Sequence, residues 1–201
     1  MAHRPFTDEK SLWHAFQLGS ELALTQLMDQ FIGPMTYYGR KLSHNDDLIQ
    51  DCIQETFIDI WQYRANLRVV QEIRPYLLTC LRRKIGQAIL KEKFLPLEEM
   101  DAGAHFELDF NVEQSLVRDE EEAQRIFELN RYINGLSRKR KEIIYLKYYQ
   151  NLSNQEIALV MGIQYQTASN LLHEALNSLR ELIPSKSILS LLFLWTTVLH
   201  Q

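Results

Sequence analysis

The sequence predicts an all-α protein built from two small helical domains. Seven glycines and five prolines in 201 residues are too few for a β-rich fold with many tight turns. Apolar residues instead recur every third or fourth position over much of the chain, which is the period of an amphipathic helix. An apolar fraction of 46% is enough for a buried core, and the length suits one domain or two small ones.

The distribution of charge divides the chain further. Residues 1–93 carry a net charge of +1, residues 94–124 carry −9 and residues 125–201 carry +4. The acidic stretch contains Pro96 and Gly103 and lacks an apolar rhythm, which is typical of a linker. It is either a solvated spacer or a separator between two lobes that each bind a polyanion. We expect an N-terminal domain at 1–94, an acidic linker at 95–119, a second helical domain at 120–183 and an apolar tail at 184–201.

The N-terminal domain begins with helical apolar spacing from Ser11 to Ser43. Gly19-Ser20 predicts a turn followed by a helix cap, and Gly33-Pro34 predicts a second break or kink. A stronger helix follows, capped by Asn45-Asp46-Asp47. Its apolar stripe consists of Leu48, Ile49, Cys52, Ile53, Thr56, Phe57, Ile60 and Trp61.

The opposite face of this helix is acidic and polar except at one position. It carries Asp51, Gln54, Glu55, Ile58 and Asp59. A solvated face is one interpretation of this pattern. An apolar residue among carboxylates, however, suggests that a partner helix could cover Ile58.

A basic segment follows. Residues 62–72 have no apolar rhythm and predict a loop that contains Arg64, Asn66 and Arg68. Pro75 is well placed at the start of the next helix, whose basic residues include Arg82, Arg83 and Lys84. Cationic groups on a rigid helix suit phosphate contacts, and Tyr63 and Tyr76 could stack on exposed bases, although packing is the commoner role of a single aromatic residue.

In the second domain, residues 120–134 predict a helix closed by Gly135, and Ser137 predicts the cap of the next one. Ser153 and Glu156 then form a capping-box pattern before a short helix. Gly162 permits a left-handed turn, Ile163 is expected to enter the core, and a longer helix starts near Gln164. Its apolar positions follow one helical stripe: Ala168, Leu171, Leu172, Ala175, Leu176 and Leu179. This order is typical of a helix-turn-helix, with a generic helical hairpin as the alternative.

If the longer helix enters a major groove, its early exposed residues meet base edges. These are Tyr165, Gln166, Ser169, Asn170 and His173. The start of the short helix, at Ser153, Asn154 and Gln155, would receive a phosphate. Glu174 has the wrong charge for DNA, and no basic residue precedes Arg180 on this helix. The pattern therefore suits a DNA reader that a larger assembly holds in place.

Two motifs together resemble the extracytoplasmic-function sigma factors of the sigma-70 family. The first is D-x-x-Q-E-x-F-x-x-x-W at residues 51–61, and the second is the helix-turn-helix from Leu136 to Arg180. The resemblance implies that Asp51, Gln54, Glu55, Ile58 and Asp59 dock on core RNA polymerase. It implies that Arg64, Asn66, Arg68, Tyr76, Arg82, Arg83 and Lys84 bind the minus-ten element of promoter DNA, and that the helix-turn-helix reads the minus-thirty-five element. An anti-sigma protein is a further possible partner. The chain departs from the family at Ser169, Leu171 and Glu174, where basic residues are frequent, and at Arg83, where asparagine is frequent.

Other classes of function find little support in the sequence. The six histidines show no metal-ligand spacing, and no phosphate-binding loop or nucleophile elbow occurs, so we expect no enzyme activity, no cofactor and no metal. The longest apolar stretch, Ile188–Leu199, is shorter than the roughly 20 residues of a membrane span. With two cysteines and no leader pattern, the expected location is the cytoplasm.

The apolar tail allows two interpretations. It predicts a terminal helix folded onto one of the lobes, or else a binding site for an inhibitor protein or a second copy of the chain. The second interpretation supports an alternative function, a stand-alone helix-turn-helix regulator that dimerises through the tail. That alternative assigns no role to the helix that contains residues 51–61.

Overall fold

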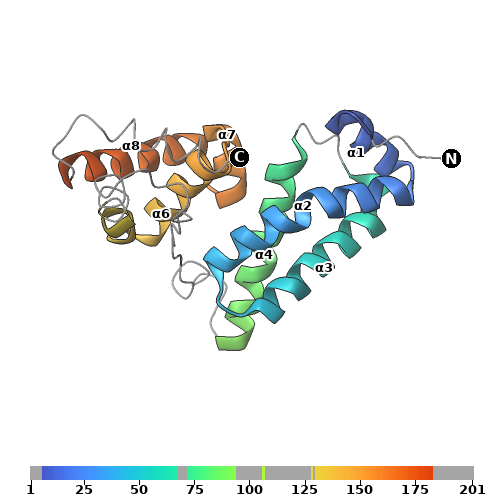
Figure 1. Ribbon diagram of the computed structural model, residues 1–201, viewed down its shortest axis with the longest axis horizontal. Coiled ribbons are helices and arrows are strands. Elements are labelled where there is room, and N and C mark those ends of the chain that lie inside the picture. The colour runs from blue at the N-terminus through green and yellow to red at the C-terminus, as the bar shows by residue number, and fades with distance from the viewer. Residues whose placement is uncertain (1–5, 68–71, 94–105, 107–127, 129, 183–201) are drawn as a thin grey trace, which may run out of the picture. The chain divides into compact units, whose positions relative to one another are not determined.

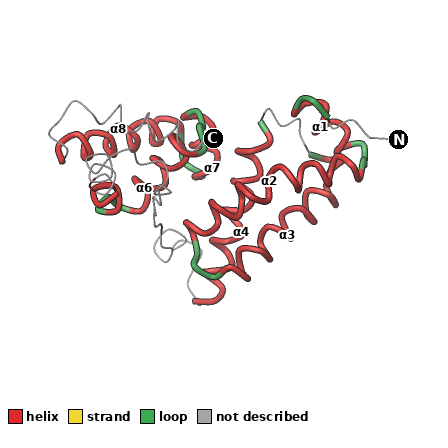
Figure 2. Tube along the Cα trace, viewed as in Figure 1, coloured by secondary structure: helices red, strands yellow, loops and turns green. Residues whose placement is uncertain are grey.

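The computed structural model describes residues 6–67, 72–93, 106, 128 and 130–182. The chain divides into two compact units, residues 1–105 and 106–201 (Figure 1). All regular structure in the described residues is helical, as Figure 2 shows, and the predicted fold class is confirmed. The boundary between the units falls inside the stretch predicted as a linker. The tail at 184–201, for which a helix is predicted, lies outside the described residues.

In its described residues, the first unit contains four α-helices and one short 3₁₀ turn. They are α1 (Glu9–Gln17), α2 (Glu21–Leu42), α3 (Asp46–Tyr63), η1 (Arg64–Asn66) and α4 (Ile73–Lys93). Helices α2, α3 and α4 pack against one another in pairs, and α1 packs on α2. The largest buried side chains of the core include Phe16, Phe31, Tyr38, Ile49 and Leu77.

The predicted caps of this unit are confirmed. Gly19 has φ +88, and the Ser20 hydroxyl accepts the Ala23 N–H at 3.3 Å to start α2. The Asn45 side chain accepts the Leu48 N–H at 3.1 Å to start α3. Both caps satisfy backbone donors that the first helical turn leaves without a partner.

Two expectations for this unit differ from the structure: a break at Gly33-Pro34, which was the alternative to a kink, and a loop that starts at residue 62. Helix α2 runs unbroken through Pro34, because buried residues on either side, Phe31 and Met35 among them, hold it against the core and offset the lost hydrogen bond. The loop predicted from residue 62 starts later, since α3 continues to Tyr63 and η1 to Asn66. Arg64 supports this extension by donating a hydrogen bond to the Trp61 carbonyl at 2.7 Å.

The second unit is built on α6 (Arg138–Ile144), a π-helical turn η4 (Tyr145–Tyr149), α7 (Asn154–Met161) and α8 (Tyr165–Leu182). Helix α8 packs against both α6 and α7. Residues 130–134 are also helical and end before Gly135, as predicted, whereas most of the rest of the helix predicted at 120–134 lies outside the described residues.

The structure of this unit differs from expectation in three details. Ser137 occupies the cap position of α6, but its side chain makes no capping hydrogen bond. The π-helical turn at the end of α6 was not expected from the sequence. It is closed by a hydrogen bond from the Gln150 N–H to the Tyr145 carbonyl, five residues earlier. Phe106, from the predicted linker, is 2% exposed and lies edge-on to the Tyr145 ring at 5.8 Å. At this residue, the predicted linker contributes to a core.

Candidate functional site

Helix α3 presents a polar face to solvent. All five residues predicted on this face are exposed: Asp51, Gln54, Glu55, Ile58 and Asp59. The opposite stripe is buried, except for the half-buried Trp61. Ile58 is 52% exposed, so burial against its own chain does not explain this apolar residue. The α3 face therefore has the composition of a surface that a partner covers.

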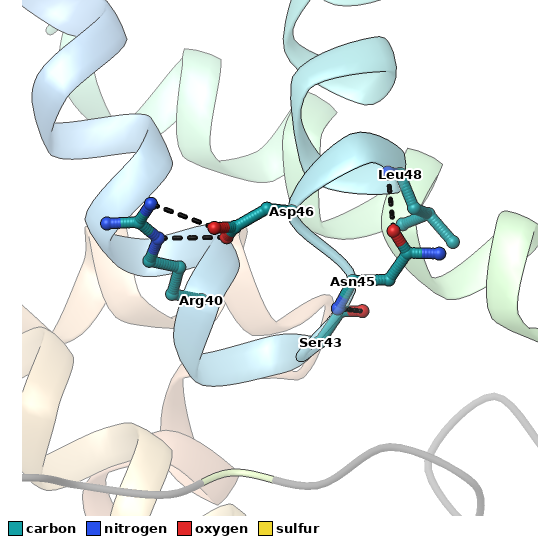
Figure 3. A network of polar contacts seen from close by, with 5 residues as sticks. All are labelled: Arg40, Ser43, Asn45, Asp46 and Leu48. Carbon is teal, nitrogen blue, oxygen red and sulfur yellow. Dashed lines mark hydrogen bonds and ion pairs between the residues drawn. The ribbon is translucent and has the colours of Figure 1, made fainter.

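A polar network fixes the start of α3 on the end of α2 (Figure 3). Arg40 holds Asp46 with two hydrogen bonds, Nε to Oδ1 at 2.9 Å and Nη2 to Oδ2 at 3.0 Å. The side-chain hydrogen bond from Arg40 lowers the pKa of Asp46. In the turn between the helices, the Asn45 N–H donates to the Ser43 hydroxyl at 3.1 Å. This network sets where the α3 face begins.

One lysine of α4 reaches two carboxylates of the α3 face. The Lys84 ammonium lies 2.7 Å from Asp59 Oδ2 and 3.2 Å from Glu55 Oε2. Burial alone would lower the pKa of Lys84, but the hydrogen bonds to Asp59 and Glu55 outweigh it and the pKa is raised. The lysine predicted to contact DNA is therefore already paired within the protein.

A groove of about 690 Å³ lies between α3 and α4. Its lining includes acidic side chains from α3, basic and amide side chains from α4, and apolar residues: Asn45, Asp47, Leu48, Asp51, Cys52, Glu55, Lys84, Gln87, Ala88 and Lys91. Burial, reinforced by the charge of Glu55, raises the pKa of Cys52 to about 11. The Cys52 thiol is therefore protonated at neutral pH, and it contributes to this groove as an apolar group.

The basic residues of α4 do not share one surface. Arg83 is exposed, as expected of a phosphate contact. Arg82 is only 7% exposed, so its side chain offers little surface for the DNA contact predicted for it. The reason is helical geometry, because Leu78, Ile85 and Ile89 lie within one or two turns on the same side and are also buried.

Tyr76 and Arg64 belong to an aromatic cluster that joins three helices. The ring centre of Trp13 in α1 lies 5.1 Å from that of Phe16 and 5.7 Å from that of Tyr76, whose ring it meets edge-on. Burial, together with Cys80, raises the pKa of Tyr76 to about 12. Arg64 stacks over the Trp61 ring at 4.3 Å. Tyr76 and Arg64, which were predicted to bind DNA, thus have partners within the protein. Of the other predicted DNA contacts, Asn66 is exposed and Arg68 lies outside the described residues.

The helix-turn-helix geometry is confirmed in the second unit. The Ser153 hydroxyl accepts the Glu156 N–H at 3.3 Å, and Glu156 Oε2 accepts the Ser153 N–H at 2.6 Å. Gly162 has φ +65, the left-handed conformation that the turn requires. Ile163 is half-buried rather than inserted in the core, because it follows this turn at the surface.

The start of α8 offers polar side chains to solvent. Tyr165, Gln166, Asn170 and His173 are exposed, whereas Ser169 is half-buried. The Asn154 amide of α7 donates to the Ser169 hydroxyl at 3.3 Å. On α7, Ser153 and Gln155 are exposed and Asn154 is half-buried. Most residues predicted to read DNA are therefore accessible on α7 and α8, and Asn154 and Ser169 link the two helices.

Two further residues on the surface of this unit are Glu174 and Leu159. Glu174 accepts a hydrogen bond from Arg140 of α6 at 2.9 Å, so the residue whose charge opposes DNA binding has a partner within the fold. Leu159 of α7 is 66% exposed, and sequence reasoning missed it because it occupies a solvent-facing position inside a largely apolar helix.

The part of the chain that the structure describes contains no cluster of three or more His, Cys, Asp or Glu side chains that could hold a metal ion. In the same residues, no helix is both long and apolar enough to cross a membrane.

Family models match both units. Residues 27–94 match sigma-70 region 2, and residues 126–179 match sigma-70 region 4. Together the two matches cover more than half of the chain. No curated protein sequence matches the chain.

The fold is shared with solved structures, among them two complexes. CnrH in complex with the cytosolic domain of CnrY is 17% identical, with 89% of this chain and 99% of that chain covered at a TM-score of 0.55. The sigma factor RpoE in complex with the anti-sigma factor NepR from Bartonella quintana is 19% identical, with 81% and 97% covered at a TM-score of 0.56.

Proposed function

The chain belongs to the sigma-70 family, with regions 2 and 4, and from this premise we propose which of its surfaces perform each step of transcription initiation. It is an RNA polymerase sigma factor, which directs core polymerase to promoters and helps to open them. Sigma factors are initiation factors rather than enzymes, and we assign no catalytic residue to this chain. Its place of action is then the cytoplasm, where core polymerase transcribes.

The α3 face is the proposed docking surface for core polymerase. It comprises Asp51, Gln54, Glu55, Ile58 and Asp59, and the exposed Ile58 among carboxylates is the observation that carries the proposal. A partner surface with basic groups around an apolar patch would complement it in charge and would remove Ile58 from water.

Promoter DNA is assigned to two other surfaces. In the first unit, Arg83 and Asn66 are exposed and remain direct minus-ten contacts, together with Arg68 as a prediction from sequence. Arg64 and Tyr76 are proposed to support the aromatic cluster rather than to contact DNA directly. The buried Arg82 is no longer proposed as a minus-ten contact. In the second unit, α8 reads the bases of the minus-thirty-five element through Tyr165, Gln166, Asn170 and His173. The residues at the start of α7 and the half-buried Ser169 lie next to the DNA phosphates instead: Ser153, Asn154, Gln155 and Ser169.

The two regions would form the domains at 1–94 and 120–183. The family matches at 27–94 and 126–179 support these bounds. An anti-sigma protein is a further proposed partner, because one solved relative is named as a complex with such a factor.

Charge reversal on α3 tests the docking surface. In the double variant Asp51→Lys and Glu55→Lys, we expect the affinity for core polymerase to fall at least tenfold, because two attractive charges become repulsive. The melting temperature should fall only slightly, since both side chains are exposed and the lost Glu55–Lys84 ion pair lies at the surface. Affinity is measured by titration of labelled core polymerase.

A matched control reverses two exposed carboxylates on α2, Glu21→Lys and Asp29→Lys, with the same change in net charge. It should bind core polymerase like the wild type. Equal losses in both double variants, or a wild-type chain that ignores core polymerase and binds duplex DNA alone, would contradict the proposed docking surface.

A further inference from the structure

We propose that Lys84 is a positioning residue of the polymerase-docking surface, where it fixes the carboxylates of Glu55 and Asp59, and that it does not contact promoter DNA. This proposal rests on the docking role of α3 proposed above. It reassigns one residue of the basic triplet on α4 from the nucleic acid to the protein partner.

The ion pairs have an asymmetry of exposure that supports this role. The Lys84 side chain is 20% exposed, while the side chains of Glu55 and Asp59 are 64% and 51% exposed. The ammonium therefore sits behind the carboxylates and touches one oxygen of each. A carboxylate can accept about four hydrogen bonds, so most acceptor positions of both groups stay available to a partner.

The groove between α3 and α4 places Lys84 on the docking side of its helix. Lys84 lines this groove together with Asp51 and Glu55 of the α3 face. Arg83, the preceding residue, is exposed and does not line the groove. Successive residues of an α-helix are about 100° apart around its axis, so α4 directs these two cations to different surfaces.

The expected consequence is preorganisation. Glutamate and aspartate side chains on a helix surface sample several rotamers, and holding them in one geometry on binding costs affinity. The Lys84 ammonium, anchored on a neighbouring helix, holds both before the partner arrives. A basic partner then meets two oriented carboxylates, and affinity is gained without any direct contact to Lys84.

Three variants test this assignment. Lys84→Met keeps the length of the aliphatic stem and removes the ammonium, Lys84→Arg restores a cation, and Arg83→Met removes the neighbouring exposed charge. Each is titrated into labelled core polymerase, and each assembled holoenzyme is titrated with promoter DNA over a series of salt concentrations. Thermal melting of the free chains detects any loss of fold.

We expect Lys84→Met to lower the affinity for core polymerase about three- to tenfold. Lys84→Arg should recover most of that loss, and Arg83→Met should leave core affinity within about twofold of the wild type. In promoter binding, Arg83→Met should reduce the slope of log affinity against log salt by about 1, and Lys84→Met should leave it unchanged.

An unchanged or higher core affinity in Lys84→Met overturns the assignment, because the ammonium would then be neutral or competing with the partner. A reduced salt slope in Lys84→Met, with core affinity intact, returns Lys84 to the DNA contacts. Both results leave the proposed function standing as long as the wild type assembles with core polymerase. Failure of the wild type to assemble would instead remove the premise.

Discussion

Three consecutive basic residues on α4 have three different environments. Arg82 is buried, Arg83 is exposed and Lys84 is bound to Glu55 and Asp59. From the sequence, all three are equally good candidates for contacts to DNA phosphates. Packing separates them because α4 contacts both α2 and α3, and each residue of a triplet points in a different direction around the helix.

One buried and one half-buried acidic group, Cys52 and Tyr76, predict a loss of stability at high pH. The pKa of Cys52 is raised from 9.0 to about 11, and that of Tyr76 from 10.0 to about 12, chiefly by burial. A group whose pKa is higher in the folded state stabilises the fold fully below its unfolded pKa and loses that contribution as pH rises through the folded value. The free energy of unfolding of the first unit should therefore fall between about pH 9 and pH 12.

Denaturant titration at a series of pH values measures this loss. Tyr76→Phe removes one ionising group while keeping the ring beside Trp13, so its alkaline loss should be smaller than that of the wild type. Tyr63→Phe, at an exposed tyrosine, is the control and should follow the wild-type profile. Identical profiles for all three proteins would show that Tyr76 does not contribute.

At the scale of elements, α2 shows how packing overrides a local signal. Gly33-Pro34 is a strong helix-breaking pair, yet α2 continues for another two turns. The same helix contains Gly39, which the side chain of Ile49 in α3 approaches closely. A Cβ at Gly39 would lie 2.6 Å from Ile49 Cγ2, whereas a Cβ at Gly33 would meet no atom within 4 Å. The two glycines therefore serve α2 differently.

Alanine substitutions at these glycines should have opposite effects. Gly39→Ala should destabilise the first unit by about 1–3 kcal/mol, because the added methyl group overlaps a buried, β-branched side chain. Gly33→Ala should stabilise it by about 0.4–1 kcal/mol, since alanine restricts the unfolded chain and fits the helix. Chemical denaturation of each variant measures both values. Stabilisation by Gly39→Ala would contradict the close packing of Gly39 against Ile49.

On the scale of the whole molecule, two compact units are joined through an acidic stretch. Each unit carries one of the family regions, and each is proposed to meet a different promoter element. Joining two binding modules makes the second contact intramolecular and raises its effective concentration. The covalent connection should therefore matter for promoter recognition, beyond the contacts of either unit.

Cutting the connection tests this view. A protease site inserted after Gly103, in the stretch predicted as a linker, allows the chain to be cleaved after purification. We expect the cleaved protein to keep its helical circular dichroism and to lose at least tenfold in promoter opening at equal concentration. The uncleaved insertion variant and protease-treated wild type are the controls. Full promoter opening after cleavage would show that core polymerase alone holds both units in place.

The sequence by itself determined the helical class, the two-region organisation, the caps at Ser20, Asn45 and Ser153, and the turn at Gly162. These features depend on residues close together in the chain, namely apolar period, short polar side chains at helix starts and the freedom of glycine. The exposed face of α3 was predictable for the same reason, because one well-formed apolar stripe defines the side opposite to it.

Only the tertiary structure decided the burial of Arg82 and Phe106, the continuity of α2 and the pairing of Lys84 with two carboxylates of another helix. The physical reason is that each of these depends on groups distant in sequence. Burial and ion pairing are set by which neighbouring helix lies over a side chain, and a local pattern does not contain that neighbour.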